Sequence, residues 1–244
     1  MQLLATAVGL SLVGSLGGLL GASALLPLPA SVRHRLVPWL LSYAVGTLLG
    51  VALLALVPEA LERLPPVSAF GALLIGILAL FVVEKFVLWR HCHTEDCDVH
   101  DASATLILIG GGLHNFADGA IIAASVLISV PLGVSTAIAV AAHQIPQEVG
   151  DFAILLNAGF SRRRALMFNA LSALSAVGGA VLVYATAETV PQALPYLLAL
   201  AAGGFLYVAM ADLIPHLHEG EAIGTGAVRQ ILLIVAGVGT ILAL

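Results

Sequence analysis

The segment Gly110–Asp151 decides what kind of fold this chain adopts. It contains two apolar stretches, each interrupted by a short polar motif: His114-Asn115-Phe116-Ala117-Asp118-Gly119, then His143-Gln144-Ile145-Pro146-Gln147-Glu148-Val149-Gly150-Asp151. A charged side chain at mid-membrane costs about 2.5–3.5 kcal/mol on insertion scales, so ionisable groups there need partners or a function. The motifs lie close in sequence and at similar depth, so we expect one site containing His114, Asp118, His143 and Glu148.

The composition places the chain in a membrane. Of its 244 residues, 60% are hydrophobic and only 9% are charged, whereas a soluble domain carries about 25% charged residues. A hydrocarbon core of about 30 Å needs about 20 apolar residues per crossing. The chain therefore has room for eight crossings and forms a single transmembrane domain over residues 1–244. No basic stripe with interleaved aromatic residues is present, which argues against nucleic acid as a ligand.

Hydrophobic runs separated by polar or proline-containing turns predict an all-α membrane protein with eight transmembrane helices. We expect them at residues 3–26, 37–58, 67–89, 103–129, 132–158, 162–186, 192–214 and 225–244. Helices one to three thus fall within 1–90, a polar loop within 91–101, helices four and five within 103–158, and helices six to eight within 162–244. The first 26 residues lack a positively charged start, so we expect a retained helix rather than a cleaved signal peptide.

The spacing of the polar residues suits metal binding. Residues four apart share one helix face, which pairs His114 with Asp118, His143 with Gln147, and Gln144 with Glu148; Asp151 continues the His143 stripe. Imidazole together with carboxylate suits Zn²⁺ and also Fe²⁺ or Mn²⁺. Pro146 removes a backbone donor and predicts a kink, and a proline-broken helix with polar groups near the midplane points to a transporter's substrate site.

The loop His91–Asp101 is a second candidate for metal binding. It packs three His, two Cys and four carboxylates into eleven residues, and its candidate ligands are His91, Cys92, His93, Cys97 and His100. Cys/His-rich tracts of this kind are typical of metal binding. On a cytosolic face the cysteines would be reduced thiols rather than a disulfide. A solvated acidic loop would explain the carboxylates but not the His and Cys residues.

The two central motifs resemble those of the ZIP family (Zrt-, Irt-like proteins) of divalent-metal transporters. The branch in question carries HNFxDG on its fourth helix and HExPHExGDF on its fifth, which here read His-Asn-Phe-Ala-Asp-Gly (114–119) and His-Gln-Ile-Pro-Gln-Glu-Val-Gly-Asp-Phe (143–152). Residues 44–50, 169–173 and 205–215 resemble the family's second, sixth and seventh helices. The resemblance implies a 3+2+3 arrangement with an inverted repeat, a homodimer, and import towards the cytosol by movement of one bundle against another.

The resemblance also implies which residues bind metal. The family's primary site corresponds to His114, Asp118, His143 and Gln147, and its neighbouring second site to Asn115, Asp118, Gln144 and Asn169, with Glu148 close by. Gln144 stands where that branch has Glu, and Gln147 stands where it has His. Because amides bind divalent metals less strongly than carboxylate or imidazole, the metal preference of the branch is not transferred to this chain.

These observations predict a carrier, not an enzyme, that moves Zn²⁺ or a similar ion (Fe²⁺, Mn²⁺, Cd²⁺) into the cytosol. One alternative is a membrane metal sensor that uses the His/Cys loop. Another is an intramembrane zinc protease, which needs a His-Glu-x-x-His helix. The matching positions here read His143-Gln144-x-x-Gln147, so the base and the second His are both absent.

The basic residues predict the orientation in the cell (inner or plasma) membrane. Eight of the nine Lys and Arg residues follow odd-numbered predicted helices, and only Arg63 follows an even-numbered one. Cytoplasmic loops carry the excess of Lys and Arg, so we expect Arg33, Arg90 and Arg163 inside and both termini outside. Single-cysteine labelling in oriented vesicles checks this, and modification of positions 63 and 163 from the same side would contradict it.

Overall fold

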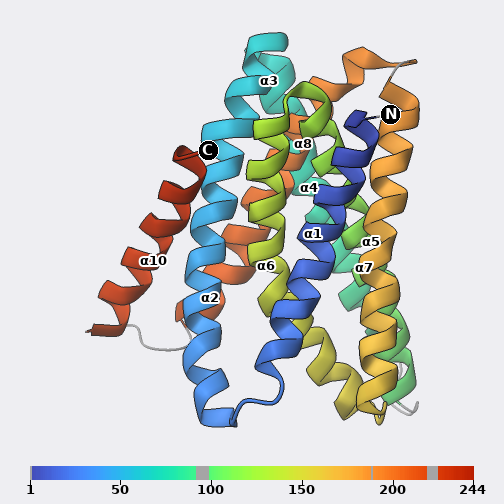
Figure 1. Ribbon diagram of the computed structural model, residues 1–244, viewed down its shortest axis with the longest axis vertical. Helices are drawn as coiled ribbons and strands as arrows, with labels where there is room; N and C mark the ends of the chain where they lie inside the picture. The colour runs from blue at the N-terminus through green and yellow to red at the C-terminus, as the bar shows by residue number, and fades with distance from the viewer. Residues whose placement is uncertain (1, 92–98, 188, 219–224) are drawn as a thin grey trace.

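The computed structural model describes residues 2–91, 99–187, 189–218 and 225–244, and every regular element in those ranges is helical. Long helices run roughly parallel or antiparallel (Figure 1). The elements are α1 Gln2–Leu25, α2 Ala30–Gly50, α3 Val57–Arg63, α4 Pro66–His91, α5 Val99–Ile128, α6 Val130–Asn157, α7 Arg162–Ala187, α8 Leu194–Tyr207, α9 Ile214–His218 and α10 Thr225–Leu242. The prediction of an all-α membrane-type chain is therefore confirmed at the level of helix content.

Two π-helical segments stand where the sequence predicted uninterrupted helix. Val51–Leu56 joins α2 to α3, and Val208–Leu213 joins α8 to α9. Each lies just before a proline, Pro58 or Pro215, at the start of the next helix. Proline lacks a backbone donor and its ring collides with the carbonyl four residues earlier, and a π segment is one way a helix accommodates such local strain. The chain therefore continues beyond Pro58 as helix, to Arg63, rather than ending there.

Two other prolines lie inside α-helices. The second helix begins at Ala30, directly after Pro29, and runs through Pro38 rather than starting at residue 37. Helix α6 runs from Val130 to Asn157 with Pro146 inside it, so the chain stays helical across the position of the predicted kink. Pro146 has no N–H, so the Ala142 carbonyl lacks its usual partner in the helical ladder.

Close glycine contacts join a first group of four long helices to one another and join a second group of four in two pairs. In the first, the site group (α1, α5, α6 and α7), a side chain at Gly119 would meet the Ala176 backbone and one at Gly179 would meet Phe116 O. In the second, the flanking group (α2, α4, α8 and α10), Gly46 lies against Ile234 O and Gly203 against Leu73 O. Small residues let helix backbones approach closely in a membrane. Among the described residues, every such glycine contact joins two helices of the same group.

The outer surface and helix lengths fit a membrane-spanning protein. By length and composition, six helical segments within the described residues are able to cross a membrane, and α10 adds a shorter apolar helix. Large apolar side chains such as Leu74, Ile75 and Leu78 on α4, and Ile231 and Leu232 on α10, are more than half exposed. Helices α2, α7 and α10 start at the lower end in Figure 1, and both chain ends lie towards the upper end.

Two adjacent glycines in α7 provide a test of this packing. A Cβ at Gly179 would lie 2.8 Å from Ala120 N and closer still to Phe116 O, whereas a Cβ at Gly178 would make ordinary contacts of 3.5 Å with the Phe116 ring. Overpacking typically costs about 1–3 kcal/mol. Gly179→Ala should therefore lower Tm in detergent by on the order of 5 °C, and Gly178→Ala should leave it almost unchanged. Equal Tm values for the two variants would contradict this packing.

Candidate metal centre

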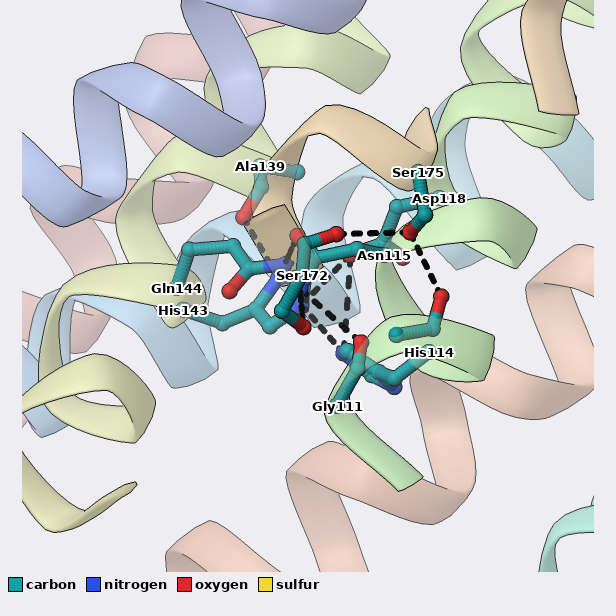
Figure 2. Close-up of polar contacts among 10 residues, drawn as sticks. Gly111, His114, Asn115, Asp118, Ala139, His143, Gln144, Ser172 and Ser175 are labelled. Carbon is teal, nitrogen blue, oxygen red and sulfur yellow. Dashed lines mark hydrogen bonds and ion pairs between the residues drawn. The ribbon is translucent and has the colours of Figure 1, made fainter. Parts of the chain in front are cut away.

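Three potential ligand atoms converge between α5 and α6 (Figure 2). His114 Nε2 lies 3.2 Å from His143 Nε2 and 3.5 Å from Asp118 Oδ2, and His143 Nε2 lies 3.4 Å from the same carboxylate oxygen. His143 and Asp118 are each 2% exposed, while the His114 side chain is partly exposed. Residues far apart in the chain thus place two imidazoles and one carboxylate around one point.

The size of this triangle matches one face of a zinc tetrahedron. For metal–ligand distances of about 2.0–2.1 Å, the ligand atoms of a tetrahedral site are separated by about 3.3–3.4 Å. The three observed separations, 3.2, 3.4 and 3.5 Å, bracket that value. The separations of the three ligand atoms therefore suit a tetrahedral ion, and cavities reach two of the three residues, His143 and His114.

A backbone carbonyl orients His143 for binding. His143 Nδ1 lies 3.0 Å from Ala139 O, one turn earlier on α6. A carbonyl oxygen only accepts hydrogen bonds, so Nδ1 carries the proton and donates it. In the neutral ring this leaves the lone pair on Nε2, the atom that faces His114 and Asp118. Metal-binding histidines are commonly held in this way by a carbonyl partner on the other ring nitrogen.

Amides form the next layer of the site. Asn115 Nδ2 donates to Gly111 O at 2.9 Å and lies 3.3 Å from Ser172 Oγ on α7. Gln144 Nε2 donates to both Asn115 Oδ1 and Asp118 Oδ2, at 2.9 Å each. The amides thus contact the triangle from one side, and α1 packs against them because Gly18 lies directly over Gln144.

The remaining sequence-predicted residues lie around this core. Glu148 and Asn169 are buried near one another, but Glu148 does not belong to the group of His114, Asp118 and His143, whose ligand atoms lie close enough to hold a metal ion. Gln147 and Asp151 line cavities that reach the histidines. Cys92, His93 and Cys97 lie outside the described residues, as do the side chains of His91 and His100.

Two cavities connect the centre to one end of the molecule. One, of about 340 Å³, is lined by His143, Gln147, Asp151, Asp212 and His216 among others. The other, of about 420 Å³, is lined by His114, Gln147 and Asp212 among others. Both approach from the end at which α2 and α7 begin and α6 ends. On the opposite side, fully buried apolar residues such as Ile122 and Val140 pack together.

Sequence reasoning missed some contributors. Ser172, which contacts Asn115, was not singled out, although Asn169, Ser172 and Ser175 form a polar stripe at a spacing of three on an apolar helix. Ala139 contributes only its carbonyl, four residues before His143, and so leaves no signal in residue type. His216 lies next to Asp212, with its Nδ1 3.5 Å from Asp212 Oδ1, at the mouth of the first cavity.

The helices and the buried His/Asp cluster define a polytopic membrane protein with a candidate metal centre. Residues 89–244 match the family described as "ZIP Zinc transporter". The chain is 34% identical to "Zinc transporter ZIP13" of Pongo abelii, over 93% of this chain and 75% of that protein. It is 30% identical to "Zinc transporter YKE4" of Saccharomyces cerevisiae, over 75% of this chain and 62% of that protein. This chain belongs to the ZIP family.

Other similarities are confined to part of the chain. A match to "Metal cation symporter ZIP14" of Mus musculus is 44% identical over 48% of this chain and 23% of that protein. A match to "Zinc transporter ZIP10" of Danio rerio is 40% identical over 52% of this chain, which spans only 16% of that protein's length. All these relatives are named as transporters, in agreement with the expectation that the chain is not an enzyme.

The triangle predicts the effect of removing any one ligand. His114→Ala, Asp118→Ala and His143→Ala should each weaken Zn²⁺ binding at least about a hundredfold, by analogy with the 3–5 kcal/mol lost when a buried charge pair is broken. Titration calorimetry on the purified protein measures this. His218→Ala, an exposed histidine outside both cavities, is the matched control. Unchanged affinity in both His114→Ala and His143→Ala would mean that these histidines only pack.

Proposed function

We propose that the chain carries Zn²⁺, or a similar first-row divalent ion, across the membrane into the cytosol through the site between α5 and α6. The observation that carries this proposal is the triangle of His114 Nε2, Asp118 Oδ2 and His143 Nε2, whose edges of 3.2–3.5 Å suit a tetrahedral ion. These three residues are the main ligands. Gln147 and Glu148 complete or gate the site, with Asn115, Gln144 and Asn169 around it.

The cavities support a direction of release. They extend from His114 and His143 past Gln147 towards Asp151 and His216. Arg33 and Arg162–Arg164 belong to helix starts at this same end, and the excess of basic residues marks the cytosolic side. The ion therefore leaves towards the cytosol along a route lined with carboxylate and imidazole groups.

The separation of glycine contacts supports movement between two bodies. Among the described residues, close glycine contacts join the helices of the site group (α1, α5, α6 and α7) to one another and pair α2 with α10 and α4 with α8 in the flanking group, and none of them crosses from one group to the other. The cavities lie between them, since α6 and α5 line one side and α2, α4 and α8 the other. We propose that the site group moves against the flanking group in a 3+2+3 fold of eight spans, assembled as a homodimer in the lipid bilayer.

Symmetric pairing of the helices also supports the inverted repeat. Helix α2 packs on α10 and α4 packs on α8, while α1 packs on α6 and α7 packs on α5. An inverted repeat exchanges α1 for α7, α2 for α8, α4 for α10 and α5 for α6. Under this exchange the α2–α10 pair becomes the α8–α4 pair, and the α1–α6 pair becomes the α7–α5 pair. The two π segments, before Pro58 and Pro215, occupy corresponding places in this exchange.

Zn²⁺ is the first choice of ion because two imidazoles with one carboxylate are typical of zinc sites. The names of the relatives, zinc transporters and a metal cation symporter, also support a divalent metal as the substrate. Fe²⁺, Mn²⁺ and Cd²⁺ remain candidates, since imidazole also binds iron and carboxylate also suits manganese.

The second candidate function, a metal sensor, depends on the composition of loop 91–101. Deleting this loop distinguishes the carrier hypothesis from the sensor hypothesis. If the chain is a carrier, the loop-deleted protein keeps measurable Zn²⁺ uptake and changes only in apparent affinity or regulation, because the described residues that line the proposed path all belong to other segments. A folded, membrane-inserted deletion variant with no uptake would contradict this.

Uptake into proteoliposomes tests the carrier itself. The purified protein should move Zn²⁺ into sealed vesicles, and His143→Ala should reduce the initial rate more than tenfold through loss of a buried ligand. A panel of competing divalent ions then ranks the substrates. His218→Ala should retain full uptake, and equal flux in His143→Ala and in the unmodified protein would show that the ion passes elsewhere.

A further inference from the structure

The hydrogen bonds around Gln144 fix which end of its side-chain amide faces the metal centre. Gly111 O can only accept, so Asn115 must turn its Nδ2 group towards it, at 2.9 Å. Asn115 Oδ1 therefore faces the other way, towards Gln144. An oxygen needs a donor, so Gln144 presents its nitrogen, 2.9 Å from Asn115 Oδ1. A single backbone carbonyl thus sets the polarity of both amides.

The same nitrogen contacts the carboxylate of the metal centre. Gln144 Nε2 lies 2.9 Å from Asp118 Oδ2, the oxygen that also faces His114 and His143. Gln144 is fully buried, and its Oε1 has no hydrogen-bond partner among the residues that the structure describes. Leaving a buried carbonyl oxygen unpaired is costly, so the nitrogen's two bonds determine how the side chain lies.

Helix α1 holds the side chain in this position. Gly18 lies so close to Gln144 that an added Cβ would overlap Gln144 Cβ and lie 3.4 Å from its Cα. With Asn115 and Asp118 on one side and α1 on the other, the amide has little room to rotate.

We propose that Gln144 is a positioning residue whose amide N–H group occupies the place of a second cation, so that this centre binds one ion. The inference rests on the proposed metal site and defines its stoichiometry. A cation that bridges Asn115 Oδ1 and Asp118 Oδ2 would have to occupy the position between these two oxygens, which Gln144 Nε2 already occupies. The amide supplies two hydrogen bonds there but no net charge. It orients Asp118 and leaves the carboxylate's charge for the single ion.

Replacing the amide by a carboxylate is the direct test. Gln144→Glu removes the donor and places a third acceptor beside Asn115 Oδ1 and Asp118 Oδ2, which a second divalent ion would satisfy. Zn²⁺ stoichiometry, measured by calorimetry and elemental analysis on the purified full chain, should rise from one to two per chain. With Mn²⁺, the electron paramagnetic resonance spectrum should change from isolated to spin-coupled, since paired sites place ions about 3.5–4 Å apart.

Two further variants separate positioning from general damage. Gln192→Glu makes the same chemical change on an exposed residue that lines neither cavity, and should keep one ion per chain. Gln144→Met keeps the length of the side chain but removes the donor. It should keep one ion and bind it about tenfold more weakly, the effect of losing one hydrogen bond to a charged acceptor.

The outcomes are distinct from those that test transport. Two ions bound by the unmodified protein would overturn the inference and leave the carrier intact. A single ion with unchanged affinity in both Gln144→Glu and Gln144→Met would also overturn it. If Gln144→Glu does not fold, the Zn²⁺ stoichiometry of the unmodified protein and the Zn²⁺ affinity of Gln144→Met still test whether the centre binds one ion and whether Gln144 positions Asp118. One bound ion without flux into vesicles would instead remove the proposed function and leave the inference standing.

Discussion

The buried carboxylate of Asp118 is the group on which the rest of the centre depends. Its Oδ2 atom is contacted by His114, His143 and Gln144, from two helices, within 2.9–3.5 Å. A charge at such a depth is costly unless it is paired and hydrogen-bonded. In the proposed carrier a cation would supply the opposite charge, and the surrounding donors would reduce the cost of burying the carboxylate while no cation is bound. The proposed carrier would therefore need the same residues around Asp118 both with the ion bound and without it.

Close packing holds these neighbours in place. The site group brings α5 against α7 at Gly119 and Gly179, and α1 against α6 at Gly18. Helix α7 supplies Ser172 to Asn115, and α1 restricts Gln144. The side chains of the centre can rotate, so their positions depend on helix backbones that are packed too closely to move apart. The glycines of the site group thus support the site by setting the distances between its helices, although they have no side chain that binds metal.

The sequence predicted much of this, and physical reasons explain what it missed. Ligands at a spacing of four on one helix, such as His114 and Asp118, can be read directly because helix geometry is regular. Which face of α5 meets α6 cannot be read this way, so the separation of the three ligand atoms came only from the structure. The π segments were also missed, because proline near a helix end is compatible with termination, a kink or a π segment. Gln144 was predicted as a ligand from its position, whereas its orientation depends on the Gly111 carbonyl, which has no signature in residue type.

The orientation of the amides has a consequence for how such a carrier turns over. A site that holds its ion with every available donor atom would bind tightly and release slowly. Here Asn115 Oδ1 is already satisfied by Gln144, and Gln144 Nε2 is a donor, so neither atom competes for the ion. In the proposed site the ion would have three strong ligand atoms, and Gln147 lines the cavities that reach two of the three ligand residues, His114 and His143. On this proposal, water from those cavities would replace the protein ligands one at a time. Release then requires no large rearrangement of the site group itself, because the same hydrogen bonds that restrict the number of ions also keep the empty carboxylate in place.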